Sequence, residues 1–304
     1  MCIRDRPRRG RPHTSAAKVQ PSLDRRLSEA QKRDYERDGY LVIEDFKSPD
    51  QIAVVRERAA AIVADFDANA GRSIFTTRDQ ALATDRYFLE SADQVRCFFE
   101  EEAFAADGSL RQPKELSINK IAHALHDRDP LFDQFSRGPE LAELALDLGL
   151  EQALIWQSMY IFKQPGIGGE VGWHQDATFL HTDPISVTTF WFALEDASLE
   201  NGCLWVEPGG HRGPLRELFI REGDSVRKER IDSSPWPGED RAVALPVRAG
   251  SLVCFHGLLP HYSAPNRSNK SRHAYSLHVT DARTRYASSN WLQRKGELPL
   301  RGFR

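Results

Sequence analysis

The stretch SVTTFWFALED, residues 186–196, carries the clearest signal for the fold. More than half of its residues are β-branched or aromatic, the types enriched in β-strands. Regularly spaced short strands separated by turn residues predict an all-β sandwich or barrel, with its core over residues 151–285. Similar stretches follow residue 150, with Gly, Pro and Asn turns between them: ALIWQSMYIFKQ (153–164), GCLWVEP (202–208), RAVALPVRAGSLVCFHG (241–257) and RHAYSLHVTD (272–281).

The part of the chain before residue 150 is predicted to be mainly helical. Ser28 is a suitable N-cap for a short helix that stops at Gly39, and YLVIEDF (40–46) reads as a strand. Ser48 and Pro49 open a second helix, and ELAELALDLGL (140–150) reads as another that ends near Gly149. Residues 68–116 look irregular or weakly helical. The second helix has apolar residues at spacings of three and four: Ile52, Val55, Ala59, Ile62, Val63 and Phe66.

Together these patterns predict an α+β protein that is mainly β. We expect one domain over residues 27–304, in which a helical N-terminal part (27–150) packs on the β-barrel. Residues 1–26 are rich in Arg, Pro and Ser without an apolar block, so we expect a disordered tail rather than a secretory signal.

Composition excludes several classes of function. A net charge of −3 argues against a general nucleic-acid or membrane-surface binder, and no apolar run approaches the ~18 residues of a membrane span. Neither GxGxxG nor GxxxxGK[ST] occurs, so nothing indicates a nucleotide-binding domain. We expect a cytoplasmic protein. Its four cysteines are far apart and predict free thiols in a reducing compartment: Cys2, Cys97, Cys203 and Cys254.

The stretch GEVGWHQDATFL, residues 169–180, contains a His-x-Asp triplet, His174 and Asp176. On a strand, residues i and i+2 point to the same face, so both side chains would enter the barrel while Gln175 points away. With a second histidine they would form a 2-His-1-carboxylate triad, which suits non-haem Fe(II). The alternative is a surface histidine beside an aspartate, because composition alone can produce such a triplet.

The segment CFHGLLPHYSAPNRSNKSRHAYSLHV, residues 254–279, offers the third ligand. If its turn SAPNRSNKS (263–271) joins two paired strands, His261 and Arg272 would share one cavity. The Arg272 guanidinium would then clamp a carboxylate, unless it is a surface arginine in a basic turn. Four histidines are candidates for the ligand: His256, His261, His273 and His278.

Residues 30–299 resemble the phytanoyl-CoA dioxygenase family of Fe(II)/2-oxoglutarate oxygenases. In this family a His-x-Asp motif is followed by a distant histidine and then, eleven residues further, by an arginine, a spacing that His261 and Arg272 match. The resemblance implies a double-stranded β-helix (jelly-roll, cupin-like) barrel. It rests on seven segments: DGYLVIEDF (38–46), SINKIAHALHDRDP (117–130), QSMYIFKQP (157–165), GGEV..HQDATFL (168–180), LENGCLWVEPGGH (199–211), HYSAPNRSNKSRHAY (261–275) and NWLQRKGELP (290–299).

The resemblance assigns roles to eight residues. It implies that His174, Asp176 and His261 ligate Fe(II) and are the catalytic centre. It implies that Arg272 and Ser263 hold the far carboxylate of 2-oxoglutarate. Three further residues fall where the family lines its co-substrate pocket: Lys120, Met159 and Trp191. Without the resemblance, Lys120 would be read as a surface lysine, and Met159 and Trp191 as plain core.

The remaining histidines are expected to be structural, with packing favoured over a substrate contact for His123 and His126, and with a turn role for His211. The implied reaction consumes O2 and 2-oxoglutarate, with ascorbate in support, and hydroxylates a small substrate. The retained Asp176 favours hydroxylation over halogenation. Two alternatives stay open: a non-catalytic jelly-roll binding protein and a zinc hydrolase with the same ligands.

Overall fold

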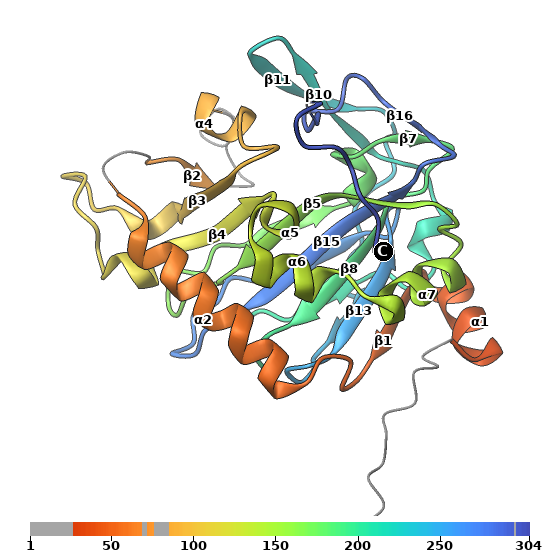
Figure 1. Cartoon of the computed structure of the whole chain (residues 1–304), viewed down its shortest axis with the longest axis horizontal. Helices are drawn as coiled ribbons and strands as arrows, with labels where there is room; N and C mark the ends of the chain where they lie inside the picture. The colour runs from red at the N-terminus through yellow and green to blue at the C-terminus, as the bar shows by residue number, and fades with distance from the viewer. Residues whose placement is uncertain (1–26, 69–71, 76–84, 295) are drawn as a thin grey trace, which may run out of the picture.

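The computed structural model describes residues 27–68, 72–75, 85–294 and 296–304. Two β-sheets face each other, and helices cover the outer face of the larger sheet (Figure 1). The predicted disordered tail, residues 1–26, lies outside the described residues, as does Cys2. The three other cysteines are buried and unpaired, as expected: Cys97, Cys203 and Cys254.

The larger sheet has eight strands in the order β1-β13-β8-β15-β5-β4-β3-β2. Neighbouring strands are antiparallel except β2 and β3, which are parallel. Its strands are β1 (Tyr40–Ile43), β2 (Ile74–Phe75), β3 (Val95–Glu100), β4 (Ile118–His123), β5 (Ala153–Ile161), β8 (Thr188–Ala193), β13 (Leu252–His256) and β15 (Ala274–Asp281).

The smaller sheet has four strands in the order β12-β9-β14-β6. Two short antiparallel pairs, β10·β11 and β7·β16, lie beside the sandwich, and the β10–β11 hairpin projects from its upper end in Figure 1. The strands are β6 (Val171–His174), β7 (Thr182–Asp183), β9 (Leu204–Val206), β10 (Glu217–Glu222), β11 (Ser225–Arg230), β12 (Val243–Leu245), β14 (His261–Ser263) and β16 (Arg285–Tyr286).

Helices α2, α5 and α6 lie across one face of the larger sheet (Figure 1). Both predicted serine caps are present, since Ser28 and Ser48 each form a capping box at the start of α1 and α2. Gly39 ends α1 with a left-handed φ of 80°. The helices are α1 (Glu29–Asp38), α2 (Pro49–Asp65), α4 (Arg86–Leu89), α5 (Leu125–Arg128), α6 (Pro130–Ser136) and α7 (Pro139–Asp147), with 3-10 turns η1 (Glu101–Ala103), η2 (Lys114–Leu116), η3 (Asp176–Thr178) and η4 (Gly210–Arg212).

Alternation along the central strands separates the helix-facing core from the interior of the sandwich. In β8, Phe190 and Phe192 belong to the core beneath the helices, and Phe192 meets Phe135 of α6 with ring centroids 5.2 Å apart. Their neighbours Thr189 and Trp191 point to the opposite side, where they line a cavity between the two sheets. One strand therefore supplies both the core and the cavity wall, because successive side chains alternate between faces.

The predicted fold class, mainly β with helices on a double-stranded β-helix, is confirmed. Two details are wrong. Residues 68–116 are not simply irregular or weakly helical, since β2 and β3 extend the larger sheet there. The strands flanking the 263–271 turn do not form a hairpin, because β14 belongs to the smaller sheet and β15 to the larger one. Within the described residues, no helix combines the length and apolar character needed to cross a membrane.

Candidate metal and co-substrate site

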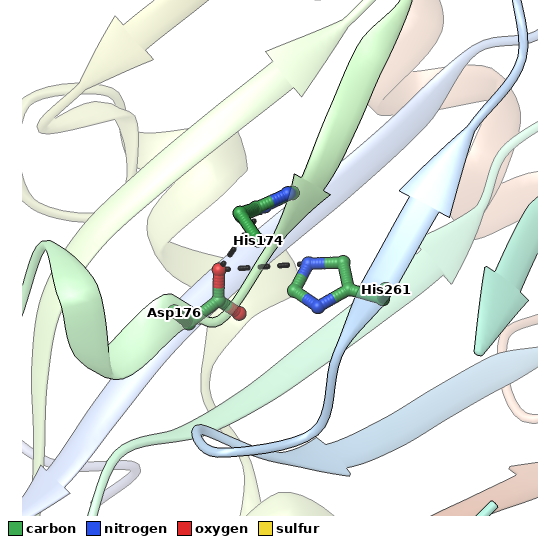
Figure 2. A group of neighbouring side chains, drawn as sticks. All are labelled: His174, Asp176 and His261. Atoms are coloured by element: carbon green, nitrogen blue, oxygen red, sulfur yellow. Dashed lines mark ion pairs between the residues drawn. The ribbon is translucent and has the colours of Figure 1, made fainter. Parts of the chain in front are cut away.

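His174, Asp176 and His261 converge at one end of the smaller sheet. His174 is the last residue of β6 and pairs directly with His261, the first residue of β14. The carboxylate of Asp176 faces both rings, with Oδ1 3.7 Å from Nε2 of His174 and 3.6 Å from Nε2 of His261 (Figure 2). The three ligand atoms lie within 4.8 Å of one another, so the chain brings together the predicted 2-His-1-carboxylate set.

Both histidine rings are oriented by a backbone carbonyl two residues earlier in the chain. Nδ1 of His174 lies 2.8 Å from the oxygen of Gly172, and Nδ1 of His261 lies 3.0 Å from that of Leu259. A carbonyl oxygen only accepts, so each Nδ1 carries a hydrogen, and Nε2 is the atom of each ring that faces Asp176 and could bind a metal. Burial, with the facing ring of His261, lowers the pKa of His174 to about 3, so the ring is neutral, as a metal ligand must be.

Gln175 points away from the ligands, as expected. Its Nε2 donates to the oxygens of Pro214 (3.0 Å) and Leu258 (2.8 Å), and its Oε1 accepts from the backbone N–H of Arg216 (2.9 Å). The expectation that His174 and Asp176 lie on the same strand is wrong, because the strand ends at His174 and Asp176 begins the 3-10 turn η3. Gln175 fixes this change of direction by bonding two separate loops.

Two residues of the larger sheet hold the second oxygen of the Asp176 carboxylate. The Thr189 hydroxyl donates to Oδ2, and Nε2 of His278 lies 3.5 Å from the same atom. Burial alone would raise the pKa of Asp176, but the imidazoles of His261 and His278 outweigh it and the pKa is lowered. The carboxylate is therefore ionised, with Oδ1 left for a metal.

The structural role expected for His278 is wrong, and Thr189 was not predicted at all. A signal for His278 was present in the sequence. Arg272 lies two residues before β15, and the residues of β15 at even spacings from it share one face; this series includes Ser276 and His278, which both line the cavity.

Replacing Thr189 with valine is expected to weaken Fe(II) binding about 10–100-fold, the usual effect of losing a group that orients a metal ligand. Valine keeps the shape of the side chain and removes the donor to Asp176. Titration of metal-free protein with Fe(II) under argon measures the change. Thr188→Val is the matched control, because the Thr188 hydroxyl bonds the carbonyl of Ser186 instead. Equal affinity in the two variants would contradict the orienting role.

The cavity between the sheets has a volume of about 230 Å³ and is lined by all eight residues singled out from the sequence. Neighbouring strands place Trp191, Ser276 and Met159 side by side in register across β8, β15 and β5. The roles of these residues toward a co-substrate remain predictions. The eight are His174, Asp176, His261, Lys120, Met159, Trp191, Ser263 and Arg272.

Arg272 is 2% exposed and incompletely bonded. Its Nε donates to the oxygen of Gly202 (3.2 Å) and its Nη2 to Oγ of Ser263 (3.4 Å), while the Trp191 ring centroid lies 5.4 Å from its Cζ. Its Nη1 is buried with no hydrogen-bond partner among the described residues. Burial lowers the pKa of Arg272 to about 10, so the side chain stays charged at neutral pH. A buried cation with a free donor fits a carboxylate.

Lys120 is a second buried cation in the same cavity. Its Nζ lies 3.1 Å from the Phe75 ring centroid and 3.8 Å from Sδ of Met159. Burial lowers the pKa of Lys120 to about 7, although Glu100 acts in the opposite direction. In the sheet, Lys120 pairs with Ile161 of β5, which on its other side pairs with Ala274. Lys120 and Arg272 therefore lie toward the same end of the larger sheet.

The other histidines divide between the cavity and the surrounding structure. His256, the rival third ligand, lies outside the ligand group and accepts from the N–H of Leu258 (3.1 Å). His126 is structural, bonded to Ser158 (2.8 Å) and absent from the cavity lining. The packing role expected for His123 is incomplete, because His123 lines the cavity.

Solved structures share this fold at low sequence identity. The non-heme alpha ketoglutarate dependent carbocyclase SnoK superposes with a TM-score of 0.60 at 21% identity, covering 90% of this chain and 96% of SnoK. EctD from S. alaskensis, solved with 2-oxoglutarate and 5-hydroxyectoine, gives 0.59 at 22% identity, covering 89% of this chain and 84% of EctD. The chain thus has the same fold as these two proteins.

Sequence relatives give the family. The family model for phytanoyl-CoA dioxygenase (PhyH) matches residues 35–274. A phytanoyl-CoA dioxygenase of Arabidopsis thaliana is 49% identical over 84% of this chain and 90% of its own length. Phytanoyl-CoA dioxygenase domain-containing protein 1 of Mus musculus is 44% identical over 90% of this chain and 97% of its own. The chain is a 2-oxoglutarate-dependent oxygenase by class. It belongs to the phytanoyl-CoA dioxygenase family.

Proposed function

We propose that this chain uses Fe(II), 2-oxoglutarate and O2 to hydroxylate a small organic substrate, forming succinate and CO2. The observation that carries the proposal is one cavity that holds both a 2-His-1-carboxylate group and a buried arginine with an unpartnered donor. The first is the donor set that suits non-haem Fe(II). The second suits the far carboxylate of a dicarboxylate co-substrate.

When bound, iron and 2-oxoglutarate supply the oxidation: O2, 2-oxoglutarate and a C–H group give succinate, CO2 and a C–OH group. The protein supplies geometry and charge. Asp176 and the two histidines would hold the iron through three ligand atoms that lie within 4.8 Å of one another. Thr189 and His278 keep the Asp176 carboxylate in place by binding its other oxygen.

The co-substrate is expected to lie between the ligand group and the two buried cations. Arg272 would donate from Nη1 to the far carboxylate, with Ser263 beside it. Lys120 would add a second positive charge from β4. Met159 and Trp191 form part of the cavity wall on either side of Ser276, which pairs with both of them in the sheet. Trp191 also packs against the Arg272 guanidinium.

The zinc hydrolase alternative lacks a carboxylate base. Of the described residues that line the cavity, Asp176 is the only carboxylate, and it faces the two ligand histidines. Hydrolytic zinc sites of the thermolysin type use an additional Glu to activate water. The non-catalytic alternative would be expected to lose a ligand or Arg272, and all are present.

The direct test is succinate formation by the purified protein with Fe(II), ascorbate and 2-oxoglutarate, compared with the Zn(II)-loaded protein. We expect succinate with Fe(II) only, at a slow uncoupled rate when the substrate is absent. Ascorbate is included to keep the iron reduced. Succinate at background with Fe(II), across a panel of small substrates, would contradict the proposed function.

The affinity for 2-oxoglutarate is expected to fall as pH rises above about 7, by up to about tenfold per pH unit, because only protonated Lys120 attracts a carboxylate. The affinity falls, and does not rise, with pH because burial lowers the pKa of Lys120 to about 7, so the ammonium loses its charge within the assay range. Calorimetric titration of 2-oxoglutarate at several pH values measures the slope. Lys120→Met should bind weakly with a flat profile. Lys228→Met, which removes a cavity-lining lysine paired with Glu217, should keep the slope.

A further inference from the structure

His123 lies at the apolar end of the cavity. It is the last residue of β4 and is 1% exposed, yet it lines the cavity wall. Its ring is surrounded by aromatic side chains, with centroids 5.5 Å from Phe88, 5.6 Å from Phe98 and 4.9 Å from Trp291. Phe88 and Trp291 stack on each other at 4.4 Å. Most buried polar atoms have a hydrogen-bond partner, so a nitrogen of this ring without one is a candidate contact for a ligand.

One of the two ring nitrogens is already engaged. The Ser91 hydroxyl lies 2.6 Å from the carbonyl oxygen of Phe88 and 2.7 Å from Nδ1 of His123. The carbonyl only accepts, so the single hydroxyl hydrogen goes to Phe88, and Ser91 accepts from His123. Nδ1 therefore carries the hydrogen. Burial and the nearby Lys120 lower the pKa of His123 well below its ordinary value, so the ring is neutral.

The other nitrogen, Nε2, is left as an acceptor. No hydrogen bond to it is found within the described part of the chain, and its ring belongs to the cavity wall. The hydrogen bonds that link Phe88, Ser91 and His123 thus fix a lone pair on Nε2 that faces this end of the cavity. A group that donates a hydrogen bond is favoured here, and a second acceptor such as a carboxylate is disfavoured.

Most of the remaining wall at this end is apolar, although Gln157 and His278, which pair with each other in the sheet, also line the cavity. Its wall includes Phe179, Leu180 and Phe219, in addition to Phe88 and Trp291. Of the cavity-lining lysines, Lys163 donates to the oxygen of Gly169 (2.8 Å) and Lys228 pairs with Glu217. A cavity of about 230 Å³ lies below the ~300–1,000 Å³ of sites for drug-sized ligands. It must also hold the co-substrate.

We propose that the prime substrate is a small, largely apolar molecule whose hydroxyl or N–H group donates a hydrogen bond to Nε2 of His123. Its apolar body packs against Phe88 and Trp291. This inference rests on the proposed function, since it treats the apolar end as the substrate compartment of an oxygenase. It assigns His123 as a residue that selects the substrate and not as a metal ligand.

The test is a binding panel of compact alicyclic and aromatic ring systems, in which each ring system is tested as the alcohol, the methyl ether and the carboxylate. Binding is measured by calorimetry and ligand-observed NMR on the Fe(II)- and 2-oxoglutarate-loaded protein under argon, where no turnover occurs. We expect at least one ring system to bind about 5–10-fold more tightly as the alcohol than as the ether, which is the effect of one net hydrogen bond. If no alcohol exceeds its ether, or if the carboxylates bind best, the proposal is overturned.

Two variants assign the preference to His123. His123→Phe keeps an aromatic ring and should reduce the alcohol-to-ether ratio to about one, without weakening the ether. Ser91→Ala removes the acceptor that fixes the tautomer and should reduce the ratio as well, which keeps the test valid if His123→Phe folds poorly. His256→Phe changes a histidine that does not line the cavity and should retain the full ratio. An unchanged ratio in both Ser91→Ala and a folded His123→Phe overturns the proposal.

This result is separable from that of the succinate assay, because binding is measured without turnover. Succinate formation without an alcohol preference would contradict the His123 assignment and leave the oxygenase function in place. A His123-dependent alcohol preference without any succinate would contradict the oxygenase function and leave a selective binding site.

Discussion

His261→Ala is expected to bring succinate formation to background and to leave the purified protein with little iron. The ring is one of the three proposed protein ligands, and its Nε2 lies 3.6 Å from the Asp176 carboxylate. Losing an outer group that orients a ligand commonly costs about 10–100-fold in metal affinity, so losing the ligand itself should exceed ~100-fold. Metal analysis and the succinate assay measure the two effects. The melting temperature should rise on adding Fe(II) to the wild type and not to the variant.

His256→Ala is the matched control. It removes the rival histidine, which lies in the same segment of chain and accepts from the Leu258 N–H, away from the ligand group. We expect near-normal iron content and turnover, with a modest loss of stability. The opposite pattern, with His256→Ala inactive and His261→Ala active, would show that the third ligand has been assigned wrongly.

Arg272→Lys is expected to raise the KM for 2-oxoglutarate by at least ~30-fold, because removing one partner of a buried charged pair costs about 2–5 kcal/mol. The ammonium of lysine keeps the charge but not the planar set of donors. It cannot donate to Gly202 and Ser263 while also presenting the free nitrogen that corresponds to Nη1. Steady-state kinetics should show the loss mainly in KM, with activity recovering at high 2-oxoglutarate and with iron content unchanged.

Arg267→Lys tests the same chemical change nearby. Arg267 lies in the turn before Arg272, but its guanidinium is half exposed and pairs with Glu102 at the surface. Such pairs contribute about 0–1 kcal/mol, so we expect no change in KM. A KM that rises equally in both variants would point to distortion of the turn. An unchanged KM in Arg272→Lys would contradict the carboxylate clamp.

Local signals in the sequence predicted the features that depend on a few neighbouring residues. Ser28 and Ser48 were predicted as helix caps because a cap needs only its own hydroxyl and the next turn of backbone. The strand at residues 186–196 was predicted from residue types alone. β3, with the mixed sequence VRCFFE, was missed because its pairing with β4 depends on contacts distant in the chain.

The site was predicted through family spacing more than through geometry. Four histidines follow residue 255, and no local pattern distinguishes His261 as the proposed ligand. Residues alone suggested a hairpin, whereas Arg272 reaches the cavity from the larger sheet and His261 from the smaller one. Thr189 and His278 could not be assigned for a related reason. Which face of β8 or β15 meets Asp176 is decided only when both sheets are assembled.

The alternation along β8 and β15 has a consequence for how such proteins diverge. Thr189 and Trp191 line the cavity, while Phe190 and Phe192, which alternate with them, belong to the core beneath the helices. Mutations at the cavity-lining positions can therefore change what is recognised while leaving the core beneath the helices in place, whereas mutations at the alternate positions disturb that core whatever the substrate. Related proteins can therefore acquire new specificities through substitutions at every second residue of these strands. Structures only 21–22% identical to this chain still superpose on it with TM-scores of 0.59–0.60, as such a division of mutational tolerance would allow.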